Sequence, residues 1–84
     1  MYYLEPGFNK RGFKTIDSAR KSATIYLQKH PEEIGGVSIK NAGSYVGRVY
    51  MTNDYLPFSR FAFESERSGK TYAIYKDGSL YKNL

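Results

Sequence analysis

One stretch of this chain repeats apolar residues every three and four positions, and the rest does not. Between Thr15 and Pro31 these residues fall on a single face of a helix, namely Ile16, Ala19, Ala23, Tyr26, Leu27 and His30. The Thr15 hydroxyl can cap the first turn, and Pro31 disfavours helical geometry at the residue before it. The sequence therefore predicts one amphipathic helix over Ile16–Lys29, with Ile25 as an apolar side chain on its polar face.

The remaining apolar segments alternate with polar residues, which is typical of half-buried strands. Strands are predicted over residues 2–4, 37–40, 45–52, 60–66 and 70–76, followed by a last strand that contains Leu80 and Tyr81. Short connections between strands favour antiparallel neighbours. The predicted fold class is α+β: a single helix packed on one face of a mainly antiparallel sheet of four to six strands, in the order β-α-β-β-β-β-β.

The pair Asp77-Gly78 is the strongest turn signal in the chain. Both central residues of a type I′ hairpin turn need positive φ, and Asp-Gly pairs are preferred there. A two-residue loop at this position pairs Tyr75 with Leu80 and Ile74 with Tyr81. The sequence therefore predicts both the turn type and the register of the last hairpin.

The chain has 84 residues, so we expect one globular domain over residues 1–84. The lack of cysteine excludes disulfides, thiolate zinc sites and cysteine nucleophiles. A small domain without disulfides favours a reducing compartment. The N-terminus has no signal-peptide pattern, and no apolar run approaches the ~20 residues of a membrane span. We predict a cytoplasmic protein without membrane contact.

Few residues in this chain are suited to catalysis. His30 is the only histidine, so no Ser–His or Cys–His pair and no histidine-based zinc site can form. Its place at the end of the apolar helix face predicts a structural role. Glu64 and Glu66 face the same side of one predicted strand, a spacing that any solvated strand face can show. The sequence therefore predicts no enzyme, with no catalytic residue, cofactor or metal.

Basic residues outnumber acidic residues by 13 to 8, and most of the excess lies in the N-terminal third. Cations bind phosphates, and aromatic rings stack on unpaired bases. Both kinds are interleaved over residues 8–14, which we expect to form an exposed turn, and more cations follow on the helix. On the sheet, Arg48 and Tyr50 share one strand face, which Tyr75 can join. The candidate nucleic-acid contacts are Phe8, Lys10, Arg11, Phe13, Lys14, Arg20, Lys21, Arg48, Tyr50 and Tyr75.

The alternative function is a protein–protein interaction module, an adaptor or inhibitor of a larger partner that does not bind nucleic acid. A sheet face with tyrosine and scattered arginine matches the composition of interaction hot spots. Ile25 and the segment 55–58 add exposed apolar candidates. An exposed strand at either sheet edge could also pair with a partner strand or mediate self-association. The sequence leaves both functions open.

Overall fold

The computed structural model describes residues 1–5, 12–33, 35–53 and 60–83. It confirms the α+β class, with one helix packed against a six-stranded antiparallel sheet. The elements are β1 (Tyr2–Glu5), α1 (Ile16–Lys29), β2 (Val37–Asn41), β3 (Ser44–Met51), β4 (Phe61–Ser65), β5 (Thr71–Ile74) and β6 (Leu80–Asn83). Within these ranges no helix is long and apolar enough to cross a membrane.

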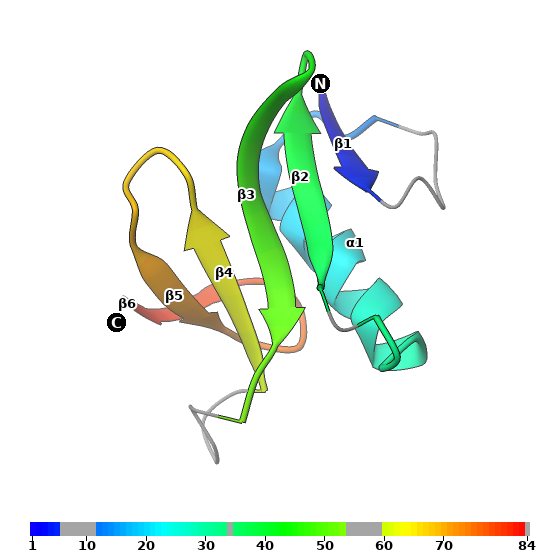
Figure 1. Ribbon diagram of the computed structural model, residues 1–84, viewed down its shortest axis with the longest axis vertical. Coiled ribbons are helices and arrows are strands. Elements are labelled where there is room, and N and C mark those ends of the chain that lie inside the picture. Colours follow the sequence, from blue (N-terminus) through cyan, green and yellow to red (C-terminus); the bar gives the residue numbers. More distant parts are fainter. Residues whose placement is uncertain (6–11, 34, 54–59, 84) are drawn as a thin grey trace.

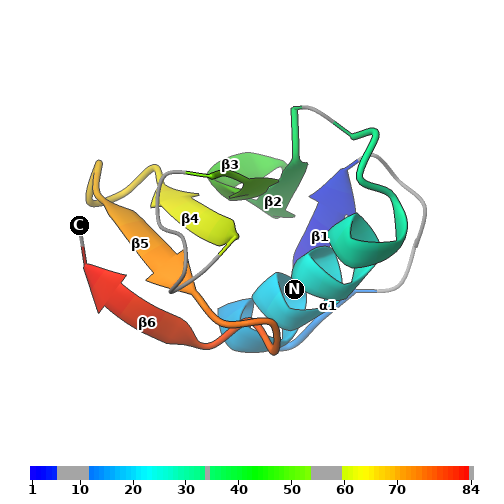
Figure 2. The same ribbon diagram turned by 90° about the horizontal axis from the view of Figure 1, so that it is seen from below.

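The strands lie in the sheet in the order in which they occur along the chain, and every neighbouring pair is antiparallel. The sheet curls, and α1 lies in its concave side (Figures 1 and 2). Seen from below, β1 runs along one side of α1, while the turn between β5 and β6 reaches its other side. The helix therefore has one covered side and one side that faces away from the sheet.

The helix begins and ends where the sequence predicts. The Thr15 hydroxyl oxygen accepts a hydrogen bond from the backbone N–H of Ser18 at 3.1 Å and so caps the first turn. At the other end the backbone N–H of His30 donates to the carbonyls of Tyr26 and Leu27, and the His30 ring stacks on Tyr26 with 4.4 Å between centroids. His30 thus closes the helix, as its position indicated.

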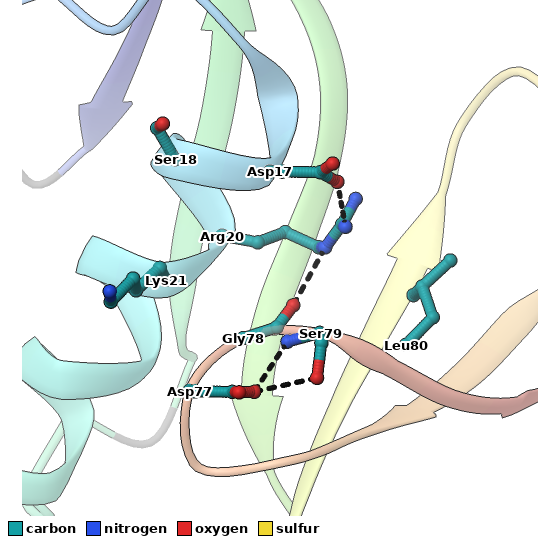
Figure 3. A pocket seen from close by; sticks show the side chains of 8 residues that line it. All are labelled: Asp17, Ser18, Arg20, Lys21, Asp77, Gly78, Ser79 and Leu80. Carbon is teal, nitrogen blue, oxygen red and sulfur yellow. Dashed lines mark hydrogen bonds and ion pairs between the residues drawn. The ribbon is translucent and has the colours of Figure 1, made fainter.

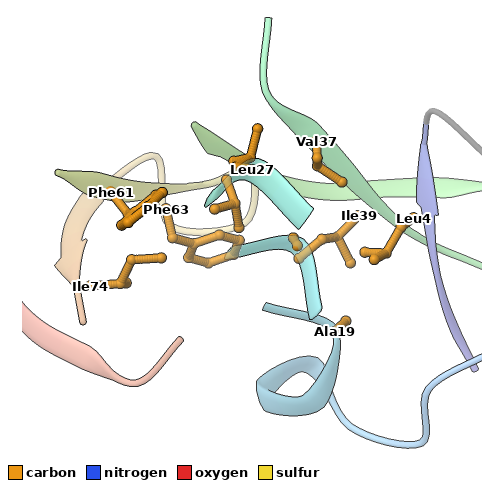
Figure 4. Packing of buried hydrophobic residues seen from close by; sticks show 10 residues of the cluster. Leu4, Ala19, Leu27, Val37, Ile39, Phe61, Phe63 and Ile74 are labelled. Carbon is orange, nitrogen blue, oxygen red and sulfur yellow. The ribbon is translucent and has the colours of Figure 1, made fainter. Parts of the chain in front are cut away.

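The core lies between α1 and the concave face of the sheet (Figure 4). Alternate residues of β1 to β5 point into it, and the helix contributes two alanines and a leucine. The small side chains of Ala19 and Ala23 are fully buried, which lets the helix backbone lie close to the strands. Burial of each large aliphatic side chain stabilises the fold by roughly 1.5–3 kcal/mol. The buried cluster consists of Leu4, Ala19, Ala23, Leu27, Val37, Ile39, Val49, Phe61, Phe63 and Ile74.

The turn between β5 and β6 differs from the prediction. Gly78 has a φ of +89°, but Asp77 does not have the positive φ that a type I′ turn requires. The Gly78 N–H donates to the Tyr75 carbonyl at 2.9 Å, and the Tyr75 N–H donates to the Ser79 carbonyl at 2.9 Å. These bonds close a three-residue loop in which a left-handed glycine follows a tight turn.

The extra loop residue changes the register of this hairpin. Ile74 pairs with Leu80, and the register shifts between Ala73 and Ile74. The predicted pairings of Ile74 with Tyr81 and of Tyr75 with Leu80 are therefore wrong. The physical reason is that a three-residue loop ending in a left-handed glycine is also a common hairpin connection, which the Asp77-Gly78 pair fits as well. The glycine is required here, because an added Cβ atom would lie 2.5 Å from the Cα atom of Lys21.

A turn with positive φ at both central residues lies elsewhere, between β2 and β3. Ala42 has a φ of +52° and Gly43 a φ of +85°, and the flanking Asn41 and Ser44 are paired. These values match a two-residue type I′ loop. The sequence signal for its type is weak, because alanine is rarely found at positive φ.

Candidate functional site

Four lysines lie on or beside the side of α1 that faces away from the sheet. Lys21 and Lys29 are eight residues apart on the helix, which places them about 12 Å apart along its axis and about 80° apart around it. Lys14 precedes the helix and borders the same shallow depression as Ser18. The Gln28 side chain donates to the backbone carbonyl of Lys76 at 3.2 Å, so this residue of the β5–β6 turn lies beside the helix. We call Lys14, Lys21, Lys29 and Lys76 the lysine face.

No ion pair joins any lysine of this face to a carboxylate in the part of the chain that the structure describes. The nearby acidic groups are engaged by other residues. The Asp17 carboxylate forms an ion pair with Arg20. Asp77 accepts hydrogen bonds from the Ser79 hydroxyl at 2.6 Å and from its backbone N–H at 2.9 Å. These two bonds, with a smaller contribution from Lys21, lower the pKa of Asp77.

Arg20 is a buried structural residue, only 5 % exposed. Its Nε donates to the Gly78 carbonyl at 3.1 Å, and its guanidinium lies 5.4 Å from the centroid of the Phe63 ring. Figure 3 shows Arg20 reaching from α1 toward the turn, whereas Lys21 points away from Arg20 and Asp17. The structure thus separates two adjacent predicted contacts: Arg20 fastens the β5–β6 turn to the helix, and Lys21 is exposed.

Arg48 and Tyr50 share the face of the sheet that points away from α1, which we call the outer sheet face. The Arg48 guanidinium lies 4.4 Å from the Tyr50 ring centroid. Arg48 also pairs with Glu64 at 3.7 Å and donates to the Gly35 carbonyl at 3.2 Å. A second cation of this sheet, Lys40 on β2, forms an ion pair with Glu5 at 3.1 Å. Protein groups therefore already contact both Arg48 and Lys40.

Tyr75 lies at the end of β5, apart from Arg48 and Tyr50. It is 46 % exposed, and its ring meets that of Tyr81 edge-to-face, with 5.0 Å between centroids. Leu80 lies next to Tyr81 in the chain and lines the same groove as Lys21. Sequence reasoning missed Tyr81 and Leu80 as surface candidates, because the two-residue turn it assumed set the wrong register for β6.

The N-terminal candidates fall into two groups. Phe13 exchanges two backbone hydrogen bonds with Tyr2, each at 2.8 Å, and its half-buried ring packs against the core. It is therefore not part of an exposed turn, whereas Lys14 is exposed. The predicted contacts Phe8, Lys10 and Arg11 lie outside the described residues, as does the apolar segment 55–58.

The lysine face and the exposed tyrosines carry groups that can bind a ligand. Over the described ranges, no three His, Asp or Glu side chains come together in a group that could hold a metal ion. The ammonium groups of the lysine face can attract anions, and the exposed tyrosine rings can make apolar and stacking contacts. Comparison with protein-family models, with curated proteins and with solved structures finds no match for this chain.

Proposed function

We propose that this protein is a non-enzymatic nucleic-acid-binding protein that contacts phosphates through the lysine face. One observation carries the proposal: the lysines on this side of the molecule have no carboxylate partner among the described residues, whereas Arg48 and Lys40 of the sheet each form an ion pair. Cations that form no ion pair within the protein are available to attract a polyanion.

The spacing of these lysines suits a phosphate backbone. The roughly 12 Å between Lys21 and Lys29 along the helix axis exceeds the axial step of about 3.4 Å between the phosphates of one duplex strand, so the two ammonium groups can meet different phosphates. Each ammonium that meets a phosphate displaces condensed counterions, so binding weakens as the salt concentration rises. The binding mode requires no proton transfer and no cofactor.

The test removes two charges from this face. Lys21→Gln/Lys29→Gln should flatten the slope of log K against log[salt] by about 1.4, at about 0.7 per contact with a single strand. Affinity at about 0.1 M salt should fall about 25-fold, because that slope acts over one decade of salt below 1 M. Fluorescence anisotropy of a labelled oligonucleotide at several salt concentrations measures both quantities.

The matched control removes two charges far from the helix. Arg67→Gln/Lys70→Gln lowers the net charge equally in the β4–β5 turn, which lies well away from α1 in both overall views (Figures 1 and 2). Binding by this variant should fall far less. Equal losses in the two variants, or a wild-type protein that binds no DNA or RNA, would contradict the proposal.

A protein partner with an acidic surface is the second candidate, and Ile25 is the observation that favours it. This side chain is 41 % exposed and lies between Lys21 and Lys29 on the helix. An apolar residue flanked by cations suits a protein interface with an apolar centre and a charged rim. For such a partner, Ile25→Ala should weaken pulldown from a cell extract, whereas it should leave the salt slope for an oligonucleotide unchanged.

A further inference from the structure

Two tyrosine rings lie exposed at the β5–β6 hairpin. Tyr75 is 46 % exposed and Tyr81 is 38 % exposed, and the two rings meet edge-to-face at 5.0 Å. In that arrangement the faces of one of the two rings are not covered by the other. Tyr75, the more exposed of the two, therefore presents aromatic surface to a ligand.

The tyrosine pair lies on the same hairpin as Lys76 of the lysine face. Lys76 follows Tyr75 directly in the chain, and its carbonyl accepts the hydrogen bond from Gln28 of α1. Leu80 lines one groove together with Lys21. The same hairpin therefore carries the aromatic rings on one side and touches the basic helix on the other.

The hairpin is firmly held. Arg20 donates to the Gly78 carbonyl at 3.1 Å, and the backbone of Gly78 lies directly against Lys21, where no side chain fits between them. A ring on such a hairpin keeps its position relative to Lys21. A ligand that spans both surfaces then loses less conformational entropy on binding than it would with a mobile loop.

We infer that the Tyr75–Tyr81 pair is a stacking site for an unpaired base, so that the nucleic acid bound is single-stranded. This inference rests on the proposed function and adds its ligand class. A duplex presents phosphates but keeps its bases stacked inside, whereas a single strand presents both phosphates and base faces. Cations and exposed rings carried by one hairpin fit the second kind of ligand, because a single strand that passes from one side of the hairpin to the other can contact both with different parts.

The experiment compares two strands that differ only in their bases. Fluorescence anisotropy measures binding to a labelled oligothymidylate and to an abasic oligonucleotide of the same length and charge. The wild type should bind the oligothymidylate about tenfold more tightly than the abasic strand, from stacking of a base on an aromatic side chain. Tyr75→Leu should remove that advantage without altering the salt slope or the affinity for the abasic strand.

Three controls make the result specific. Tyr75→Phe keeps the ring and should keep the affinity, and Tyr81→Leu tests the second ring if Tyr75→Leu unfolds in thermal denaturation. Tyr45→Leu removes a ring of similar exposure, 39 %, from the start of β3 and should bind as the wild type does.

Each contrary result has a separate meaning. Equal wild-type affinity for both strands, or equal binding by Tyr75→Leu and Tyr45→Leu, overturns the stacking inference while phosphate binding stands. Failure of the wild type to bind either strand overturns the proposed function as well. In that case, capture of a protein partner that depends on Tyr75 would instead identify the exposed pair as a protein interface.

Discussion

The two sides of this molecule both carry cations but engage them differently. On the outer sheet face Arg48 lies between Glu64, the Gly35 carbonyl and the Tyr50 ring. On the helix side Lys21 and Lys29 form no ion pair with any described carboxylate. The net charge of +5 therefore says little about where a polyanion can bind until the partners of each cation are known.

The difference follows from the geometry of the two elements. In the sheet, Arg48 and Glu64 occupy directly opposite positions on β3 and β4, so antiparallel pairing itself brings the opposite charges together. On the helix, Asp17 is the only acid within α1, and it lies three residues before Arg20, where it meets the arginine. Lys29 lies in the last turn, where a cation also favours the helix dipole. Lys21 lies in mid-helix, away from the helix end, so a favourable interaction with the dipole does not account for it.

The largest predicted effect is a loss of stability, and it tests whether the fold depends on the close contact between the β5–β6 turn and α1. Gly78→Ala places a Cβ atom 2.5 Å from the Lys21 Cα atom, in a residue with a φ of +89°. We expect a loss of about 3 kcal/mol in the free energy of unfolding, from backbone strain together with overpacking against the helix backbone. Urea denaturation measures it.

Gly69→Ala is the matched control for that substitution. Gly69 also has positive φ, +68°, but an added Cβ atom there meets nothing within 4 Å. Only the conformational term remains, so we expect a loss of about 1 kcal/mol. Equal losses in the two variants would show that the turn does not depend on close contact with α1, and the rigid placement of the tyrosine pair would fail with it.

Much of the fold is predictable from local patterns, because those patterns act over a few residues. The helical spacing together with Thr15 and Pro31 defined the helix, and period-two alternation located the strands. The Asp77-Gly78 turn was misread because this pair fits both a two-residue and a three-residue hairpin loop, and the local sequence does not decide between them.

The candidate site was less predictable than the fold for the same reason. Arg20 and Lys21 look alike in a basic helical segment, and only the packing of the β5–β6 turn shows that one is buried and the other exposed. A signal was present in the sequence, since Asp17 stands three residues before Arg20 and can pair with it. No comparable local signal predicts the contact between Tyr75 and Tyr81, because this contact depends on the register of β6.

The next effect separates the two arginines that the sequence treated as equivalent. Arg20→Met leaves the Gly78 carbonyl without its donor in a buried setting, so we expect a loss of about 2 kcal/mol in the free energy of unfolding. Arg48→Met removes a half-exposed ion pair and a cation–π contact, for which about 1 kcal/mol is expected. Urea denaturation of both variants measures the difference. A larger loss for Arg48→Met would reverse the structural roles of the two residues.

The smallest predicted effect tests whether the ion pair with Glu64 makes Arg48 unavailable to a polyanion. Glu64→Gln removes the carboxylate that lies 3.7 Å from Arg48, and Glu66→Gln changes the net charge equally without removing an ion pair of the described residues. If pairing occupies Arg48, only the first variant offers a strand a new cation. The slope of log K against log[salt] should then steepen by about 0.7, which corresponds to about fivefold in affinity at 0.1 M salt. Oligonucleotide anisotropy across a salt series measures this change.

Equal slopes for the two variants would show that Arg48 stays unavailable without Glu64, because Gly35 and Tyr50 still hold it. The contrast between the two sides of the molecule would then rest on burial rather than on charge pairing.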